Sequence, residues 1–274
     1  MANTRFQYVK HFEEDERVLR NTYFVVRIDG KGFHKFTQEH NFDKPNDKNA
    51  LMLMNRVAYE IFKGYGDIIF AIGESDEYSF IFRRNTDLFQ RRREKILTTI
   101  VSQFSSYYVF YWPEYMKEKP LLYPPSFDGR VVIYPSPENI RDYIGWRQAD
   151  THINNLYNTS FWALVLQGKK TEKEAENILK GTLSKDKNEL LFTQFGINYN
   201  NEGEMFKKGS VLFREKGIRI KEKLQNHPNT VGRIFLDETK EPDYSSVKDD
   251  DYIIAVFHMD VIKPEFWKDH NDIL

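Results

Sequence analysis

Short runs of β-branched and aromatic residues alternate along the chain with longer segments in which apolar residues recur at helical spacing. The runs predict strands, and a tight Glu-Ser-Asp turn between the second and third of them is typical of a hairpin. Because so short a turn joins antiparallel neighbours, we expect an antiparallel sheet. The predicted strands are residues 24–29, 67–74, 77–82, 127–135, 209–215 and 252–262.

The longer segments predict helices that cover this sheet. At the start of the first one, Asn46 or Asp47 is suited to cap the helix. Strands and helices mixed in this way are typical of an α+β protein rather than a doubly wound one. A polar stretch from Lys221 to Asp251 predicts loops or a flexible arm. The predicted helices are residues 46–65, 88–112, 137–166, 171–182 and 185–195.

The composition excludes several classes of protein. Hydrophobic residues fill 40% of the 274 positions, which excludes a disordered chain. The chain has no cysteine, which excludes a disulfide scaffold and a cysteine zinc site. A charged amino terminus and the lack of any apolar run of about 18 residues favour a soluble protein with no membrane partner, cytoplasmic or alternatively nuclear. Because the net charge is −1, a nucleic-acid surface would have to be a local basic patch.

Two acidic residues stand where predicted strands end. Asp29 closes the first strand, and Asp76 lies in the turn between the second and third. If these strands are neighbours, both carboxylates converge on one edge of the sheet, as hard cations such as Mg²⁺ require. Two metal ions held there can activate a hydroxyl and stabilise the leaving oxygen in nucleotidyl transfer. Taken singly, each acid is better explained as a solvated turn residue, so the hypothesis depends on the pair.

The turn after Asp29 has a composition suited to phosphate binding. Gly30 and Gly32 let the backbone approach a ligand, and successive amides from Gly30 to Phe33 can point at phosphate oxygens. Such a sequence is more often only a tight turn. His34, which follows the turn, either touches a triphosphate or packs at the surface.

One predicted helix carries a polar stripe beside its apolar face. The side chains of this stripe could face a triphosphate, although a solvated helix face explains the pattern as well and is commoner. The stripe consists of Arg92, Lys95, Thr99, Ser102 and Ser106.

The segment HINNLYNT combines poor helix formers with helical flanks. Asn154, Asn155 and Asn158 all carry a propensity cost, and such local conflicts tend to mark functional sites. His152 and Asn155 share one helix face, so they could read base edges, or they could belong to a buried hydrogen-bond network. Lysines further along add local positive charge that could meet phosphates, namely Lys185, Lys187, Lys207 and Lys208.

Six motifs in this order resemble the tRNA-histidine guanylyltransferase family, in its eukaryotic form, over about residues 1–215. They are RIDGKGFHKF, KPND, GESDEYSFIFRR, WRQADTHINNLYNT, SKDKNELLF and INYNN. The resemblance implies a polymerase-type palm that adds a guanosine to the 5′ end of histidine tRNA. It also implies activation of the 5′ end by ATP, attack by GTP, loss of pyrophosphate and assembly into a homotetramer.

The resemblance assigns roles to individual residues. Two Mg²⁺ ions would be bound by Asp29, Asp76 and the Gly30 carbonyl, with Glu77 as a further catalytic acid. Phosphates would meet Arg27, Arg92 and Lys95. The tRNA would contact His152, Asn155, Lys187, Asn198 and Lys208, and the nucleotide would be held by Gly30, Lys31, Gly32, Phe33, His34, Lys44, Asn46, Asp47 and Ser75.

The resemblance also divides the chain and leaves alternatives. We expect a palm in residues 1–136, a helical tRNA-binding part with a returning strand in 137–220, and a variable arm or last strand in 221–274. The first alternative is template-dependent repair of 5′-truncated tRNAs. A catalytically silent RNA-binding protein is the next alternative, and a nucleotide cyclase is the most distant. Glu74 departs from the family, in which Gln or Asp is more usual.

Overall fold

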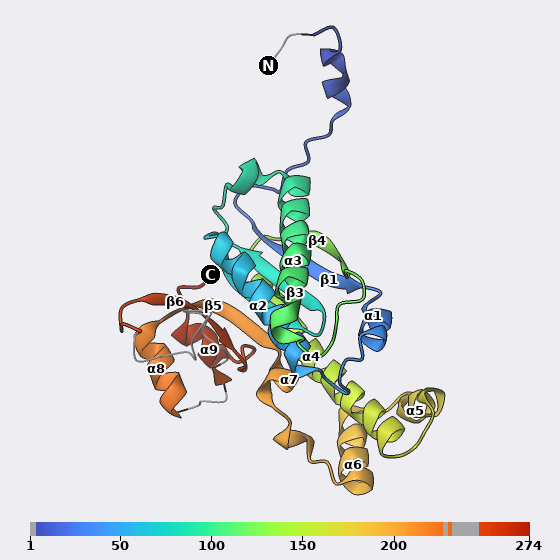
Figure 1. The fold of residues 1–274 in the computed structure, drawn as a ribbon. Helices are drawn as coiled ribbons and strands as arrows, with labels where there is room; N and C mark the ends of the chain where they lie inside the picture. The colour runs from blue at the N-terminus through green and yellow to red at the C-terminus, as the bar shows by residue number, and fades with distance from the viewer. Residues whose placement is uncertain (1–3, 227–229, 232–246) are drawn as a thin grey trace.

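A six-stranded antiparallel sheet forms the centre of the protein in the computed structural model, which describes residues 4–226, 230–231 and 247–274. The strands lie in the order β4-β1-β3-β2-β5-β6 (Figure 1), which confirms the predicted α+β class. Every predicted strand is present. The sheet combines strands from all three predicted divisions of the chain, which are residues 1–136, 137–220 and 221–274. Their bounds are β1 Tyr23–Lys31, β2 Ile68–Glu74, β3 Glu77–Phe82, β4 Ser126–Tyr134, β5 Ser210–Lys216 and β6 Tyr252–Phe257.

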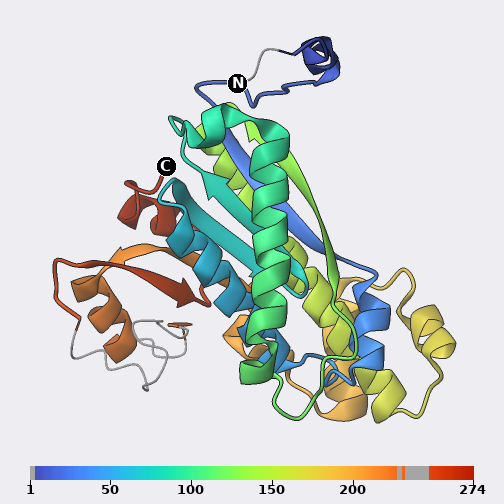
Figure 2. The same cartoon turned by 45° about the horizontal axis from the view of Figure 1, so that its top comes forward.

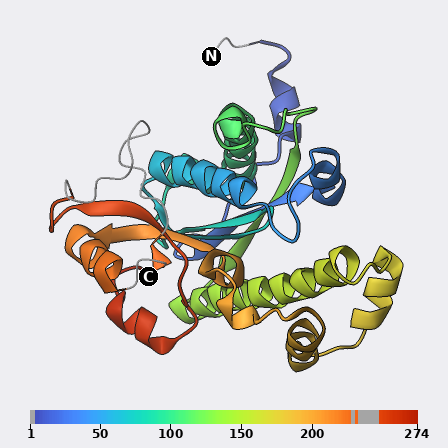
Figure 3. The same ribbon diagram turned by 60° about the horizontal axis from the view of Figure 1, so that its bottom comes forward.

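Helices cover both faces of the sheet. On one face lie α2 (Lys48–Gly64) and α3 (Arg93–Tyr115), and on the other lies α4 (Pro137–Leu166), as Figure 3 shows. Because side chains alternate along a strand, β1 sends Val26 into the core under α2 and α3 and Val25 into the core under α4. Both are fully buried, so the central strand is apolar on both faces.

Smaller elements surround this three-layered body. Figure 2 shows the amino-terminal segment with η1 projecting away from the body, and η1 has no buried residue. At the far end of α4, α5 and α6 pack around small apolar clusters of their own. Among the described residues, no helix combines the length and apolarity needed to cross a membrane. The bounds are η1 Gln7–Phe12, α1 Phe33–Glu39, η2 Leu88–Arg91, α5 Glu172–Leu179, α6 Ser184–Phe195, η3 Tyr199–Asn201, α7 Glu204–Lys208, α8 Gly217–Asn226 and α9 Pro264–Asp269.

The helix predicted from residue 88 was wrong in its first turn, because α3 begins only at Arg93. Phe89, Gln90 and Arg91 have φ angles of 49°, 55° and 61°, which an α-helix cannot accommodate. The buried guanidinium of Arg91 donates to four backbone carbonyls, those of Val18, Leu19, Thr22 and Thr86. This buried cation fixes the segment in front of β1, and the sequence pattern alone does not reveal it.

The prediction of loops from Lys221 onward was also wrong for its first residues. They continue α8, an amphipathic helix that buries Ile220. Residues 227–229 and 232–246 of the predicted arm lie outside the described residues. The predicted last strand exists as β6 and pairs with β5, but it ends at Phe257.

Replacing Glu215 with glutamine should destabilise the fold at neutral pH by about 3 kcal/mol. Glu215 is buried in β5, where its carboxylate lies 2.7 Å from the Lys223 ammonium of α8 and 2.9 Å from His270 Nε2 after α9. Although burial opposes ionisation, hydrogen bonds from His270 and Lys223 outweigh it and lower the Glu215 pKa from 4.5 to about 2.

The pH dependence of unfolding tests this interpretation. Because the folded pKa is depressed, the stabilisation is fully present above pH 4.5 and disappears as the pH falls toward 2. Free energies of unfolding from urea titrations should therefore differ between wild type and Glu215→Gln at pH 7, and the difference should shrink near pH 3. A difference that does not change with pH would contradict the assignment.

Candidate functional site

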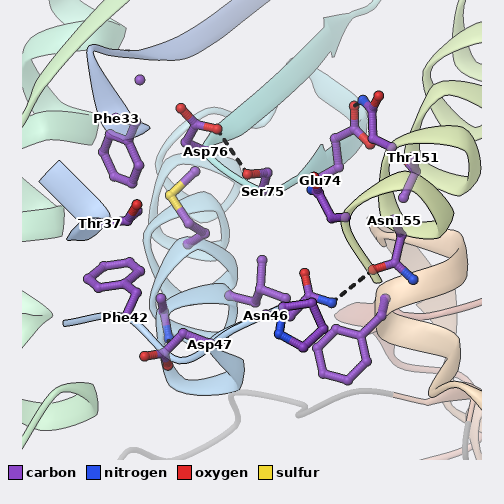
Figure 4. A pocket seen from close by; sticks show the side chains of 18 of the residues that line it. Phe33, Thr37, Phe42, Asn46, Asp47, Glu74, Ser75, Asp76, Thr151 and Asn155 are labelled. Atoms are coloured by element: carbon purple, nitrogen blue, oxygen red, sulfur yellow. Dashed lines mark hydrogen bonds between the residues drawn. The ribbon is translucent and has the colours of Figure 1, made fainter. Parts of the chain in front are cut away.

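A cavity of about 620 Å³ opens at the end of the sheet where β1 stops and β2 turns into β3. Residues from α1, α2, α4 and α7 complete its wall, so it lies between the sheet and the helical part. The volume is in the range of small-molecule and cofactor sites. Figure 4 shows Phe33, Asp76 and Ser75 on one side and Thr151 and Asn155 on the other.

Asp76 is held against the backbone of Gly30. The Gly30 amide donates to the Asp76 carbonyl at 3.2 Å, and the Ser75 hydroxyl donates to Asp76 Oδ1 at 3.0 Å (Figure 4). A Cβ on Gly30 would lie 2.6 Å from Asp76 Oδ2, so only glycine permits this approach. Burial raises the pKa of Asp76, and the charge of Asp29 adds to the rise.

The two predicted metal-binding acids reach the same end of the sheet from different sides. Asp29 is paired with Glu77 across β1 and β3, and its Oδ2 lies 3.5 Å from Arg27 Nη2 on the face that α4 covers. Asp76 instead lies over Gly30 and lines the cavity, whose wall does not include Asp29. The two carboxylates thus lie on opposite sides of the Gly30 backbone at the end of β1, where the charge of Asp29 acts on Asp76.

The oxygen donors at this end of the sheet fit a magnesium ion that is bound partly by the protein and partly by a substrate. Within the described ranges, no cluster of three or more His, Cys, Asp or Glu side chains is placed to hold a metal. The protein would supply only some of the oxygen ligands, from Asp29, Asp76 and the Gly30 carbonyl. Mg²⁺ commonly binds in this way, through one or two carboxylates while water and phosphate oxygens complete its octahedron.

Glu77 belongs to a buried ionic network rather than to the cavity wall. It pairs with Arg27, and its Oε1 lies 2.9 Å from Arg147 Nε. Burial raises the pKa of Glu77 to about 7, although the charges of Arg147 and Arg27 oppose the rise. Arg147 Nη2 also lies 3.3 Å from Glu74 Oε1, and the same guanidinium pairs with Asp150.

Sequence reasoning missed Arg147, although a signal for it was present. Arg147 follows Tyr143 and Ile144 at helical spacing and precedes Thr151, so an arginine occupies the buried stripe of α4. Only 3% of Arg147 is exposed. An arginine is rarely buried without partners, so this position predicted acidic neighbours.

Most residues predicted to hold a nucleotide do line the cavity. Lys31 is the exception, since it is exposed at the end of β1 and does not line the cavity. Asp47 is buried and caps α2, where its Oδ1 accepts from the amides of Asn49 and Ala50, and it pairs with Lys119. Residues of the predicted set in the wall are Gly30, Gly32, Phe33, His34, Lys44, Asn46, Asp47 and Ser75.

The predicted phosphate-binding residues are not brought together within one chain. Arg27 lies beside Asp29 near the end of β1. The backbone of Arg92 forms an isolated antiparallel β-bridge with that of Arg17, in the segment that precedes β1. Lys95 Nζ lies 5.1 Å from the Phe89 ring centroid. Arg92 therefore lies near the beginning of β1 and Lys95 lies in the first turn of α3, whereas Asp29 lies at the end of β1.

The HINNLYNT segment contributes both to internal hydrogen bonding and to the cavity. Asn155 is buried, accepts from Asn46 Nδ2 at 2.8 Å and donates to the Tyr199 hydroxyl at 3.0 Å. The His152 ring lies 5.5 Å from the Tyr199 ring. Burial lowers the His152 pKa, and the charges of nearby lysines add to this. Asn155 also lines the cavity, together with Asn154 and Asn158.

The remaining residues predicted to contact RNA lie outside the cavity. Lys187 in α6 donates to the Thr182 carbonyl at 2.9 Å, and Asn198 accepts from the Asn200 amide ahead of η3. Lys208, at the end of α7, pairs with Asp260 at 3.3 Å. All three are thus partly engaged within the protein.

Comparison with known proteins gives a consistent result over the whole chain. The family model described as tRNAHis guanylyltransferase matches residues 6–135, and that described as the Thg1 C terminal domain matches 138–263. A probable tRNA(His) guanylyltransferase of Dictyostelium discoideum is 49% identical over 274 residues, covering 100% of this chain and 99% of the relative. The tRNA(His) guanylyltransferase of Neurospora crassa is 50% identical over 278 residues, covering 98% and 94%.

Solved structures agree with this similarity. The crystal structure of the Saccharomyces cerevisiae tRNA(His) guanylyltransferase superposes with a TM-score of 0.73 at 52% identity, covering 76% of this chain and 92% of the other. A bacterial tRNA(His) guanylyltransferase-like protein in complex with ATP gives 0.63 at 22% identity, with coverages of 76% and 84%. This second likeness bears on the fold alone.

Proposed function

Because the chain belongs to the tRNAHis guanylyltransferase family, we propose that it is the nucleotidyltransferase that adds a guanosine to the 5′ end of histidine tRNA. Full-length identity of 49% to a relative of that name is the observation that carries this assignment. The cavity beside Asp76 supports it, since its volume of about 620 Å³ suits a nucleoside triphosphate.

We propose the three chemical steps that the family resemblance implies. A 5′-phosphate oxygen of the tRNA attacks the α-phosphorus of ATP, which releases pyrophosphate. The 3′-hydroxyl of GTP then attacks the activated 5′-phosphorus and displaces AMP. Finally, water attacks the α-phosphorus of the triphosphate at the new 5′ end and releases pyrophosphate, which leaves a 5′-monophosphate. Two Mg²⁺ ions held by Asp29, Asp76 and the Gly30 carbonyl would supply positive charge for the entering and leaving oxygens.

The protein's own groups would orient the nucleotide for these steps. Ser75 lies in the wall beside Asp76, His34 follows Phe33 in the same wall, and Lys44 supplies a cation on the side of α4. Lys44 Nζ lies 5.2 Å from the Trp162 ring centroid. Burial lowers the pKa of Lys44, while the charges of Glu172 and Asp47 oppose this. We assign Lys44 to the triphosphate because it is the half-buried cation of the described cavity wall.

The RNA would extend from the carboxylates along α4 toward α6. We keep His152, Lys187, Asn198 and Lys208 as proposed contacts on that part of the protein. A phosphate contact of Arg92, which lies near the beginning of β1, would require either a long RNA or a second copy of the chain, and Lys95 follows it in the first turn of α3. A homotetramer in the cytoplasm or nucleus is part of this proposal, and its mass in solution would test it.

Incubation with defined RNAs tests the function directly. Purified protein receives ATP, labelled GTP and a 5′-phosphorylated histidine tRNA transcript, and we expect one labelled guanosine per transcript. A 5′-truncated tRNA serves as the second substrate, because efficient template-directed filling of that end would favour the repair alternative. Failure to incorporate GTP into either RNA with Mg²⁺ present would favour a silent RNA-binding protein.

Replacing Gly30 with alanine should reduce guanosine addition by about a hundredfold or more, because repositioned charge-stabilising groups cost that much. The new Cβ would lie 2.4 Å from the Phe33 ring and 2.6 Å from Asp76 Oδ2, so the carboxylate has to move. Initial rates with labelled GTP measure the loss. Gly64→Ala is the matched control, since its Cβ meets nothing within 4 Å. Equal rates for both variants would contradict a close approach at Gly30.

A further inference from the structure

Two reactants must meet near Asp29 and Asp76, and the cavity accounts for one of them. It reaches Gly30 and Asp76 from the side of α1 and α2. Asp29 lies on the other face of β1, together with Arg27. This is the face of the sheet that α4 covers (Figure 3). The second reactant therefore has to approach along the α4 face at the edge formed by β4.

An exposed aromatic ring stands on that side. Trp146 of α4 is 52% exposed, although large aromatic side chains in α4 are otherwise mostly covered. The Arg27 guanidinium carbon lies 5.9 Å from the Trp146 ring centroid, and Arg27 Nη2 lies 3.5 Å from Asp29 Oδ2. A single side chain thus links the exposed indole to the acid proposed to bind the metal ion.

The indole is held in place from within the helix. The Arg147 guanidinium carbon lies 4.1 Å from its ring centroid, and the Tyr143 ring lies 5.9 Å away in an edge-on arrangement. Both neighbours are buried. A ring fixed by buried partners and half open to solvent is pre-organised for stacking, because little side-chain entropy is lost on binding.

A second cation completes this surface. Arg130 of β4 is the cross-strand partner of Arg27, so both side chains leave the sheet on the same face. The side chain of Arg130 is 58% exposed, and its nearest acidic partner, Asp128, lies 3.9 Å away. A flat ring beside guanidinium groups is the combination that binds a nucleobase and its neighbouring phosphate in single-stranded RNA.

We propose that Trp146 stacks on the first base at the 5′ end of the tRNA and that Arg130 contacts the 5′-phosphate beside it. This arrangement presents that phosphate to Asp29 from the face opposite the nucleotide cavity. The inference rests on the proposed function and names the binding place of its RNA substrate. Trp146 and Arg130 therefore act in RNA binding, whereas the cavity acts on GTP and ATP.

Binding measured without ATP or GTP tests the inference separately from catalysis. The probe is a 5′-phosphorylated histidine tRNA transcript with 2-aminopurine as its first base, whose fluorescence falls when it stacks on an indole. We expect quenching by the full-length wild type. Trp146→Ala should lose the quenching and raise the Kd for RNA about tenfold, as loss of one base–aromatic stack predicts. Trp146→Phe should retain most of the affinity.

Matched variants separate the two contacts. Phe110→Ala removes a ring of 72% exposure from α3, on the other face of the sheet, and should leave Kd and quenching unchanged. Arg130→Ala should abolish the preference for a 5′-phosphate over a 5′-hydroxyl transcript while quenching persists. The KM for GTP should be unchanged in Trp146→Ala.

Three results would overturn the inference. Unchanged RNA affinity and quenching in Trp146→Ala would remove the stack. A raised KM for GTP with normal RNA affinity would place the ring in nucleotide binding. A change of assembly mass in Trp146→Ala would mean that the ring covers a contact between copies. Because wild-type guanosine incorporation is measured independently, none of these results is confused with failure of the proposed function.

Discussion

Asp76→Asn should reduce guanosine addition by on the order of a thousandfold while the protein stays folded. The asparagine keeps the shape and the Ser75 contact but removes the charge that the proposed metal ions need. Asp29→Asn should have an effect of the same order, because both carboxylates flank Gly30. Single-turnover incorporation of labelled GTP at saturating Mg²⁺ measures the loss.

The stability of Asp76→Asn provides an internal control. Burial raises the pKa of Asp76, so the charged form costs folding free energy. Because the folded pKa is raised, this cost is absent below the unfolded pKa and grows as pH rises through the folded pKa. The variant should therefore be at least as stable as wild type at pH 8. Wild-type rates in a folded Asp76→Asn protein would remove the metal assignment.

Arg147→Ala should combine a loss of stability of about 3 kcal/mol or more with a large loss of activity, because it breaks a buried ionic network. Its guanidinium lies 2.9 Å from Glu77 and 3.3 Å from Glu74, the two residues on either side of Ser75 and Asp76. Removing the cation leaves the partly buried Glu74 and the buried Glu77 facing each other across the hairpin, with only Arg27 still paired to Glu77. The turn that carries Asp76 should then shift.

Urea unfolding and incorporation kinetics together test the role of Arg147. At a temperature where the variant is fully folded, kcat should fall at least a hundredfold, as for other misplaced catalytic groups. Arg147→Ala combined with Glu74→Gln should be less destabilised than the sum of the single changes, since one of the stranded charges is gone. Additive effects and a normal kcat would mean that Arg147 does not position the turn.

The hairpin that carries Asp76 could be predicted from sequence because its signal was local. The pairing of β1 with β3, which brings Asp29 to this hairpin, was a condition of the metal hypothesis and was not itself predicted. The relative orientation of the two carboxylates could not be predicted. It depends on Ser75, whose φ of 49° turns the chain so that Asp76 lies over Gly30.

Contacts between distant segments were the part that periodicity could not supply. Arg91 looks like a surface charge in the linear sequence, yet it is buried and donates to the Val18 carbonyl. Periodicity places Arg147 in the buried stripe of α4, but it does not identify Glu77 as its partner. Asn155 is a second residue whose contacts could not be predicted from the sequence. Its poor helix propensity suggested RNA contact or internal bonding equally, and only the folded chain brings Asn46 and Tyr199 to its amide.

Because α4 is one continuous helix, it fixes the distance between the two ends of the protein that it connects. Its buried Arg147 sits beside the carboxylates, whereas its last residue, Leu166, lies at the end where α5 and α6 pack. At 1.5 Å per residue these points are about 28 Å apart. The RNA that we propose to contact α6 would reach Asp29 only if its own dimensions match that interval. Substrate choice would then follow from molecular measurement, in addition to any reading of individual bases.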